Sequence, residues 1–207
     1  RAMRSGRFNA VTLVLSAEDT TRSSLPGHVL HAAAAALEER GMHLTIAVLP
    51  DAKLTNDSYL PRMLREQGSD GLLVNYNKLT PPGMVQLLED HHLPAIWLND
   101  KRNHDAVRPD DEAAAAEAVK RLIALGHRRI AYVNQTYKHN YAHYSEIDRR
   151  TGYERAMRRA GLEPVTIDRY HPGVQAKGWA GHIEHWLGEE GRPTAVIAYG
   201  SGCLTCF

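Results

Sequence analysis

The chain has 207 residues, a length that permits one large or two small α/β domains. Its 25 Lys and Arg residues almost balance its 24 Asp and Glu residues, and the net charge of +1 excludes the broad basic face with which a stand-alone nucleic-acid-binding protein displaces counterions from phosphates. Hydrophobic residues make up 43% of the chain and charged residues 24%, which argues against disordered and fibrous classes and predicts a globular fold with a sizeable core.

The sequence shows neither a membrane span nor a disulfide framework. No run approaches the roughly 18 apolar residues of a span, and no apolar stretch of the signal-peptide kind follows the basic residues 1–7. We therefore expect a cytoplasmic protein without a membrane partner. The two cysteines, Cys203 and Cys206, resemble half of a redox or metal site, but a lone pair at a chain end is weak evidence, and we expect no cofactor.

A first series of strands and helices alternates between residues 11 and 98. The expected strands are apolar or β-branched runs at 11–15, 44–49, 71–75 and 94–98. The expected helices run from Leu25 to a stop at Gly41, from Asp57 or Ser58 through Met63 and Leu64, and from Pro81-Pro82 across Met84–Leu88. This alternation predicts a parallel sheet with helices on both faces.

A second series follows a turn-rich stretch at 99–105 and a short extended piece at 106–108, which we interpret as a crossover. Asp110 and Asp111 cap an alanine-rich helix that ends near Gly126. The remaining strands are expected at 129–133, 165–168 and 195–199, and the remaining helices at 147–160 and 176–187. Two series predict two similar lobes, and ligands of parallel sheets bind beyond the carboxyl ends of the strands, so the loops of both lobes are expected to surround a shared cleft.

The segment Gly126-His127-Arg128-Arg129-Ile130-Ala131 closely resembles a motif of the lactose/galactose-repressor (LacI/GalR) family of bacterial transcription regulators. Further similar segments follow the order of that family: 70–76, 94–100, 149–153 and 192–195. The resemblance implies a periplasmic-binding-protein-like α/β fold of two lobes, each a parallel sheet flanked by helices. It implies a post-hinge linker at 1–9, an N-terminal lobe at 10–108 and a C-terminal lobe at 109–207.

The chain departs from the family pattern at both ends. The family begins with a helix-turn-helix headpiece and a hinge helix, and residues 1–7 resemble only the segment after that hinge. Operator DNA is therefore expected to bind through a headpiece absent from this chain. Gly200 and Ser201 stand where the family has an Asn-Asp pair, and the chain stops at Phe207, where the family continues. We therefore expect the second lobe to be incomplete at its C-terminus.

A sugar-like effector needs polar groups and apolar walls on the loops that follow strands. Asn75, Asp100 and Arg149 match positions that the resemblance assigns to effector contact. The structural alternatives are that Asn75 caps a turn, that Asp100 forms an Asx-turn and that Arg149 is a solvated charge. The other candidate ligand-binding residues are Ser24, Leu25, Asn134, His171 and Tyr199.

These other candidates also have structural alternatives. The family usually has aromatic residues that stack on the effector where this chain has Leu25 and Pro26, so we expect no such stacking here, and Ser23 or Ser24 could simply cap the following helix. Tyr and His side chains offer an apolar body with a polar tip, yet Tyr199 could belong to the core and His171 to the surface. The segment 137–144, rich in Tyr and His, could shape ligand choice or form a mobile flap.

The twelve histidines invite a metal hypothesis. The closest spacings are those of His139 with His143, His182 with His185, and His91 with His92. No carboxylate or cysteine completes a ligand set with them, so we predict solvent-exposed histidines and no metal. The sequence also lacks a dinucleotide-binding glycine motif, a phosphate-binding loop and a nucleophile elbow, which favours a binding protein over an enzyme.

The sequence thus predicts the effector-binding and dimerisation domain of a bacterial transcription regulator. An effector that bridges Asn75 and Asp100 of one lobe and Arg149 of the other would favour one lobe orientation, and so change the spacing of two DNA-binding headpieces in a homodimer. The alternative is a solute-binding protein that delivers a sugar to a transporter, against which the missing signal peptide argues. An enzyme on the same fold is a third, weaker hypothesis.

Overall fold

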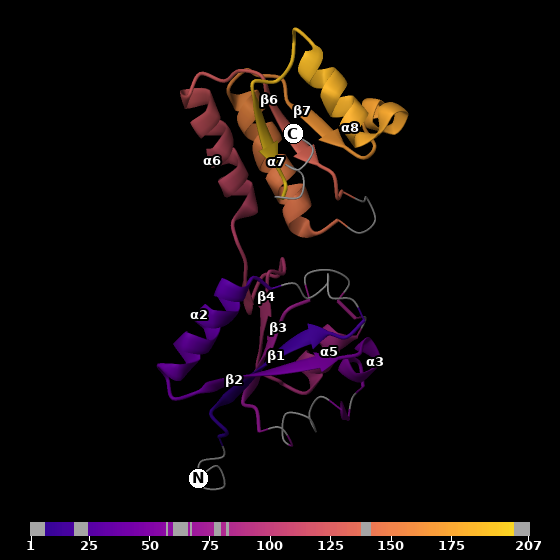
Figure 1. Ribbon diagram of the computed structural model, residues 1–207. Coiled ribbons are helices and arrows are strands. Elements are labelled where there is room, and N and C mark those ends of the chain that lie inside the picture. Colours follow the sequence, from indigo (N-terminus) through magenta and orange to yellow (C-terminus); the bar gives the residue numbers. More distant parts are fainter. Residues whose placement is uncertain are drawn as a thin grey trace. The chain divides into compact units, whose positions relative to one another are not determined.

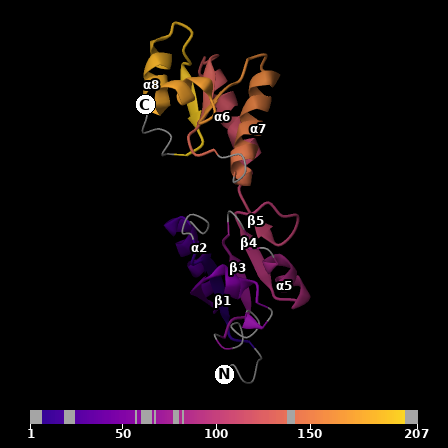
Figure 2. The same ribbon diagram turned by 90° about the vertical axis from the view of Figure 1, so that its right-hand side faces the viewer.

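The computed structural model describes residues 7–18, 25–56, 58–59, 66, 68–76, 80–81, 83–137 and 142–200. The chain divides into two compact units at a single point, with unit 1 at Arg1–Pro109 and unit 2 at Asp110–Phe207 (Figures 1 and 2). Each unit contains its own parallel sheet with helices packed on it, which confirms the predicted α/β class. Within the described residues, no helix combines the length and apolar character needed to cross a bilayer.

Unit 1 is built on a five-stranded parallel sheet with the strand order β2-β1-β3-β4-β5. Its strands are β1 (Ala10–Ser16), β2 (His43–Leu49), β3 (Gly71–Val74), β4 (Ala95–Leu98) and β5 (Ala106–Val107). Its helices are α2 (Gly27–Glu38), α3 (Asp51–Leu54) and α5 (Met84–Asp90). Figures 1 and 2 both show α2 on one side of this sheet and α5 on the other.

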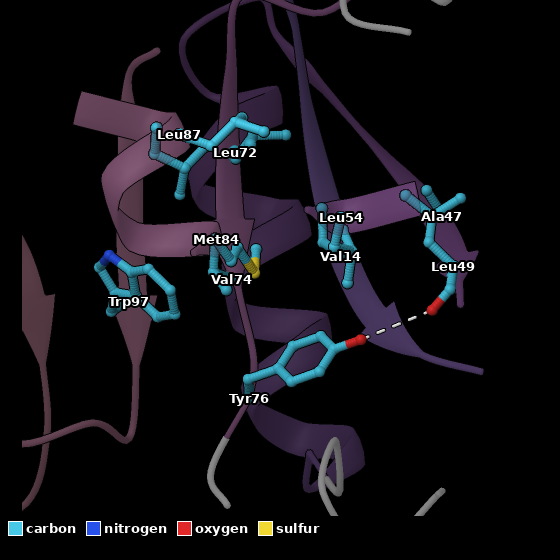
Figure 3. Packing of buried hydrophobic residues seen from close by; sticks show 11 residues of the cluster. Val14, Ala47, Leu49, Leu54, Leu72, Val74, Tyr76, Met84, Leu87 and Trp97 are labelled. Carbon is cyan, nitrogen blue, oxygen red and sulfur yellow. Dashed lines mark hydrogen bonds between the residues drawn. The ribbon is translucent and has the colours of Figure 1, made fainter. Parts of the chain in front are cut away.

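The core of unit 1 lies on the face of the sheet that α3 and α5 cover. Figure 3 shows strand residues such as Val14 and Val74 beside Leu54 of α3 and Met84 of α5, all of them fully buried. Tyr76, also buried, donates a hydrogen bond from its hydroxyl to the carbonyl oxygen of Leu49 at 3.5 Å. This cluster ties both helices to the sheet.

The opposite face of unit 1 is covered incompletely. Helix α2 contains no buried residue. Side chains alternate along a strand, so Ile46 and Val48 of β2 lie on the opposite face from the buried Ala47 and Leu49, and they are 53% and 59% exposed. Because β2 is also an edge strand, unit 1 presents an apolar strip at one side of its sheet.

Unit 2 has a three-stranded parallel sheet with the order β7-β6-β8. The strands are β6 (Ile130–Asn134), β7 (Val165–Asp168) and β8 (Ala195–Ala198), and the helices are α6 (Asp111–Ala124), α7 (Tyr144–Arg159) and α8 (Pro172–Gly188). Alternate residues of β6 enter different clusters: Ile130 and Tyr132 pack with α6 and α7, whereas Ala131 and Val133 pack with α8. Both faces of this sheet are therefore covered by buried side chains.

Helices α6 and α7 approach each other closely at Gly152. A Cβ atom at this position would overlap the carbonyl oxygen of Glu112, so only glycine permits the observed packing. The first turn of α6 is capped as predicted, because the Asp110 carboxylate accepts a hydrogen bond from the backbone N–H of Ala113 at 3.0 Å. The N-terminus of α6 is thereby placed against the first half of α7.

All the predicted strands are present with ends within one residue of their expected positions, but several helices differ. Helix α7 begins at Tyr144 rather than near Ile147, because His143 and Glu146 form a capping box. Helix α8 begins at Pro172 rather than 176, and Gly178 interrupts it with a non-helical conformation (φ 70°, ψ 174°).

Two further differences concern the helices of unit 1. The short α3 was not predicted, and the predicted helix through Met63 and Leu64 falls mostly outside the described residues. The N-cap position of α2 is Pro26, and no side chain among the described residues caps this helix with a hydrogen bond. Ser23 and Ser24 themselves lie outside the described residues, as do His139, Cys203 and Cys206.

Candidate functional site

Polar side chains gather in unit 2 where β6 and β8 end and where α6 and α7 begin. Asn134 is the last residue of β6, and Tyr199 directly follows β8. Asp111 opens α6, and Arg149 lies in the second turn of α7. We call the set formed by Asp111, Asn134, Ser145, Glu146, Arg149 and Tyr199 the polar edge. It occupies the carboxyl ends of the strands, where ligands of parallel α/β sheets bind.

Arg149 is held in one orientation by two hydrogen bonds. Its Nε donates to Oδ1 of Asp111 at 2.6 Å, and its Nη1 donates to the carbonyl oxygen of Tyr199 at 2.7 Å. Its guanidinium carbon lies 5.0 Å from the centroid of the Tyr199 ring. The Arg149 side chain is 38% exposed and Asp111 only 3%. The alternative that Arg149 is a solvated charge is therefore wrong, and its remaining N–H groups are suited to donate to a ligand.

The electrostatics of the polar edge keep the guanidinium charged. Burial by itself lowers the pKa of Arg149, but the hydrogen bond and the negative charge of Asp111 outweigh it, and the pKa is raised. Oδ2 of Asp111 is buried and has no hydrogen-bond partner within the described part of the chain. A buried carboxylate oxygen without a donor is costly, so this atom is suited to accept a hydrogen bond from a ligand.

A second carboxylate, Glu146, holds together the end of β6 and the start of α7 within the polar edge. It is 1% exposed, and it accepts hydrogen bonds from Nδ2 of Asn134 at 2.9 Å and from the backbone N–H of His143 at 3.2 Å. Ser145 Oγ lies 2.9 Å from the hydroxyl of Tyr199. Burial raises the pKa of Tyr199, which keeps this phenol protonated. A continuous polar network thus runs from β6 through the start of α7 to β8.

The predicted ligand-binding residue Asn134 is a structural member of this network. Its Oδ1 accepts hydrogen bonds from the backbone N–H and the hydroxyl of Thr136, at 3.0 Å and 2.9 Å. Its amide nitrogen is engaged by Glu146, and the residue is only 2% exposed. Asn134 therefore anchors the loop after β6 to the start of α7.

His171 lies after strand β7 and is not part of the hydrogen-bond network described above. It follows β7 and forms the N-cap of α8, where its Nδ1 accepts a hydrogen bond from the N–H of Gly173 at 3.2 Å. Its ring centroid lies 4.7 Å from that of His182, because the break at Gly178 lets α8 fold back. The ring of His182 in turn stacks on Trp186 at 6.2 Å.

The prediction of solvent-exposed histidines is wrong for two of them. His143 is 5% exposed because it caps α7, and His182 is 6% exposed because it lies inside the fold of α8. Neither ring nitrogen of His182 has a hydrogen-bond partner among the described residues, and burial lowers its pKa. Within the described ranges, no group of three or more His, Cys, Asp or Glu side chains is placed to hold a metal ion.

The candidates of unit 1 follow neighbouring strands. Asn75, fully buried, comes directly after β3, and its backbone N–H donates to the carbonyl oxygen of Val14 at 3.2 Å. Asp100 follows β4 and accepts a hydrogen bond from Nε of Arg102 at 2.9 Å. The guanidinium carbon of Arg102 in turn lies 3.7 Å from the Trp97 ring centroid, which fixes the ion pair. Leu25 is partly buried ahead of α2.

Three members of the polar edge, Asp111, Ser145 and Glu146, were not predicted from the sequence. From the sequence, Asp111 is predicted only to cap a helix. A glycine inside a helix, such as Gly152 three residues after Arg149, can indicate that another helix packs closely against it, and here that helix is α6. Glu146 could have been found from its position three residues after His143, because this spacing is typical of a capping box at the start of a helix.

Comparison with known proteins gives a consistent result. A family model described as periplasmic binding proteins and sugar binding domain of LacI family matches residues 12–201. An arabinose metabolism transcriptional repressor of Geobacillus stearothermophilus is 28% identical over 83% of this chain and 49% of its own length. Catabolite control protein A of Priestia megaterium is 34% identical over 67% of this chain and 41% of its own length.

Solved structures show the same fold at lower identity. The crystal structure of a regulatory protein of LacI family from Chloroflexus aggregans has a TM-score of 0.67 at 20% identity, over 96% of this chain and 72% of that one. The sugar-binding transcriptional regulator (LacI family) from Escherichia coli, complexed with phosphate, has a TM-score of 0.62 at 20% identity, with 97% of this chain and 72% of that one covered. This chain spans about half or less of the length of the two relatives compared by sequence.

Proposed function

Because the chain belongs to the family of periplasmic binding proteins and sugar-binding domains of LacI type, we propose that it is the effector-binding and dimerisation domain of a bacterial transcription regulator. The observation that carries this proposal is Arg149, partly exposed and fixed by the buried Asp111 beside Tyr199. Such a group donates hydrogen bonds to a ligand without a large loss of side-chain entropy. No chemical reaction and no cofactor are assigned to it.

We propose a carbohydrate as the effector class. Its hydroxyls can accept hydrogen bonds from Arg149 and donate to Asp111, and its C–H faces can pack on the ring of Tyr199. The name of the Geobacillus relative, an arabinose metabolism repressor, supports this class. Asn75, Asp100 and Leu25 of unit 1, with His171 of unit 2, are proposed as further contacts, each testable by its own substitution.

The apolar strip of unit 1 supports a homodimer. Ile46 and Val48 on β2 are more than half exposed, and Val29 of α2 is 37% exposed. An exposed apolar edge strand is a surface that soluble proteins normally cover, and a second copy can cover it through a two-fold interface. We further propose that operator DNA is bound by a headpiece outside this chain and that the regulator acts in the cytoplasm.

A thermal-shift screen tests effector binding. The chain is melted with mono- and disaccharides, sugar phosphates and nucleosides, and a ligand of the native state raises the Tm. We expect at least one carbohydrate to raise the Tm of the wild type and of Arg158→Ala, an exposed arginine of the same helix, but not of Arg149→Ala. Cooperative melting without any shift, or an equal shift in Arg149→Ala, would contradict the proposed site.

Sedimentation velocity tests dimerisation. The double variant Ile46→Glu/Val48→Glu places charges on the exposed strip and is expected to be monomeric under conditions where the wild type is a dimer. Val107→Glu is the matched control, because Val107 is 64% exposed on β5, the other edge strand of the same sheet. The family description also covers periplasmic binding proteins, so a sugar receptor of a transport system is the second candidate, and a monomeric wild type would favour it.

A further inference from the structure

Helix α8 consists of two halves that meet at Gly178. This residue has φ 70° and ψ 174°, a conformation outside the helical region that glycine adopts more readily than other residues. The first half is residues 172–177. The second half, residues 179–188, folds back and brings the ring of His182 beside that of His171 at the N-cap. We call residues 179–188 the returning segment, and Gly178 is the hinge about which it can turn.

The ring of His182 holds the returning segment against the first half of the helix. It packs on Gly173, where an added Cβ atom would overlap Nδ1 and Cε1 of the ring. On its other side it stacks on Trp186 with an interplanar angle of 16°. His182 is 6% exposed, and neither ring nitrogen has a hydrogen-bond partner in the described part of the chain. This position therefore suits an uncharged ring and offers no acceptor to the two N–H groups of a protonated one.

The charged groups near His182 also oppose its protonation. Burial lowers the pKa of His182, and the positive charges of His171, His185 and Lys177 lower it further. Glu189 acts in the opposite direction, but its carboxylate lies 3.2 Å from Nε2 of His185. The strands that pack against α8 contribute apolar side chains, which are Ala131, Val133 and Ile167. A protonated His182 is thus stabilised better by water than by the groups that surround it in the folded helix.

Acid does not weaken the helical structure of the returning segment in the same way. His185 and Glu189 are spaced i,i+4, and they form an ion pair when His185 carries a proton. Both side chains are about half exposed, so the pair is screened and its contribution is small. Its sign nevertheless favours the helix in acid. Protonation of His182 should therefore loosen the contact between the two halves of α8 rather than unwind the second half.

We propose that the returning segment of α8 is a pH-sensitive latch on unit 2. The latch is closed while His182 is uncharged, and protonation of this ring releases the segment about Gly178. Opening exposes the apolar side chains that the segment contributes to the core, Ile183 and Trp186. This device goes beyond the proposed function and does not depend on it, because it involves no ligand and no second copy of the chain.

Proton linkage sets the size of the effect. In the open form His182 is solvated and takes the ordinary histidine pKa of about 6.5, so the open form binds a proton more readily than the closed one. Acid therefore favours opening. Between pH 7.5 and pH 5.5 the ratio of open to closed molecules should rise by up to about tenfold, the full factor applying where the closed form takes up no proton.

Hydrogen exchange of the backbone amides, followed by mass spectrometry at pH 7.5 and 5.5, tests the latch. Rates are divided by those of unstructured peptides at the same pH, so that they report the open population. We expect amides of residues 179–188 to lose protection by about five- to tenfold at pH 5.5, while those of α7 keep theirs. No loss in the returning segment, or an equal loss in α7, would overturn the proposal.

The variant His182→Phe keeps a ring between Gly173 and Trp186 that cannot take up a proton. The returning segment of this variant is expected to be equally protected at the two pH values. His185→Gln is the matched control, because it removes an exposed histidine from the same segment, and it should still lose protection in acid. A pH dependence in His182→Phe like that of the wild type would refute the role of this ring.

The variant Gly173→Ala should open the latch without acid. Its methyl group takes the place of the His182 ring, which lies at the end of a side chain and is displaced more easily than backbone. Protection of residues 179–188 is expected to be low already at pH 7.5 and to change little at pH 5.5. Gly191→Ala is the control, since a Cβ there meets no atom within 4 Å. Full protection of the returning segment in Gly173→Ala at pH 7.5 would contradict the proposed latch.

Discussion

The two sheets of this chain are covered to different extents. In unit 2, buried clusters lie on both faces, one with α6 and α7 and one with α8. In unit 1, the buried cluster lies on the α3 and α5 face, whereas α2 on the other face buries none of its residues. A helix can therefore form all its backbone hydrogen bonds above a sheet and still leave part of that face exposed to solvent. The exposed part of the unit 1 sheet is then available for contact with a partner.

The same contrast is visible between single helices. Helix α7 buries six residues and meets α6 at a glycine, so the two backbones approach closely. Helix α2 has an unbroken run of alanines at 32–36 and no side chain that is fully buried. Substitutions that enlarge or remove side chains should therefore have large effects in unit 2 and on the α5 side of unit 1, and small ones along α2.

The largest effect is expected for Gly152→Ala. The new methyl group would overlap the backbone of Glu112, which can move only if α6 moves, so the free energy of unfolding of unit 2 should fall by about 3 kcal/mol or more. Chemical denaturation in a Trp97→Phe background measures this, because Trp179 and Trp186 then report unit 2 alone. Gly188→Ala is the control, since a Cβ there meets no atom within 4 Å. Equal losses in the two variants would refute the close-approach argument.

Next in size is Met84→Ala in unit 1. Met84 is fully buried in α5 against the sheet, and its truncation leaves a cavity that should cost about 2 to 3 kcal/mol. Val29→Ala in α2, at a position 37% exposed, should cost less than about 0.5 kcal/mol. Urea denaturation in a Trp179→Phe/Trp186→Phe background, in which Trp97 is the remaining tryptophan, compares the two variants by fluorescence. A cost for Val29→Ala close to that of Met84→Ala would remove the contrast between the two faces.

A smaller effect is expected for Tyr153→Phe in α7. The buried hydroxyl accepts a hydrogen bond from the N–H of Val165 at 2.7 Å and lies 2.9 Å from the carbonyl oxygen of Ile130, so it links the starts of β6 and β7. Its loss should cost unit 2 about 1 to 2 kcal/mol. Tyr170→Phe, at a position 42% exposed, should cost much less.

Tyr153 also makes unit 2 sensitive to alkali. Burial raises the pKa of Tyr153 to about 12, above the ordinary value of about 10 for a tyrosine. The unfolded chain then loses this proton at lower pH than the folded one, and the stability of unit 2 should decline as pH rises above about 10. Denaturation profiles at several alkaline pH values should show this decline in the wild type and a weaker one in Tyr153→Phe.

The smallest effect is expected at His182 and appears in acid. Burial lowers the pKa of His182, and the neighbouring His171, His185 and Lys177 lower it further, while Glu189 opposes them. The unfolded chain therefore takes up a proton first, so stability is complete above the ordinary histidine pKa of about 6.5 and is lost as pH falls below it. The free energy of unfolding of unit 2 should therefore be lower at pH 5 than at pH 7, as measured by urea denaturation at both pH values.

The variant His182→Phe tests that assignment, because phenylalanine keeps a ring against Trp186 and cannot take up a proton. Its stability should vary less between pH 7 and 5 than that of the wild type. His28→Gln, which changes an exposed histidine of α2, should leave the acid profile of unit 2 unchanged. The same slope in His182→Phe and in the wild type would assign the acid sensitivity to other groups.

The sequence pattern is sufficient to predict where the strands lie, but it does not predict the exact helix ends or the contacts between helices. Short β-branched runs such as 11–15 locate β1, because the pattern reports burial on both faces of a parallel sheet. The predicted starts of α7 and α8 are wrong, since hydrophobic periodicity does not report a histidine cap or a glycine that interrupts a helix.

The candidate site was predictable only in part, for the same reason. Arg149 was predicted as a ligand-binding residue from the family resemblance, and Tyr199 from its position at the end of a predicted strand. Asp111 becomes a partner of Arg149 only through the approach of α6 to α7, a long-range contact that periodicity along one helix does not report. The burial of His182 likewise depends on the conformation of Gly178, four residues earlier, whereas composition alone favours an exposed ring.

The single division of the chain at Pro109 has a consequence for its synthesis. All the described strand pairings of unit 1 join residues that precede Asp110. On the ribosome these residues emerge before any part of α6, so the first sheet can assemble while the second is still being translated. Nascent-chain protease protection should then appear for unit 1 before the codons of β8 are read.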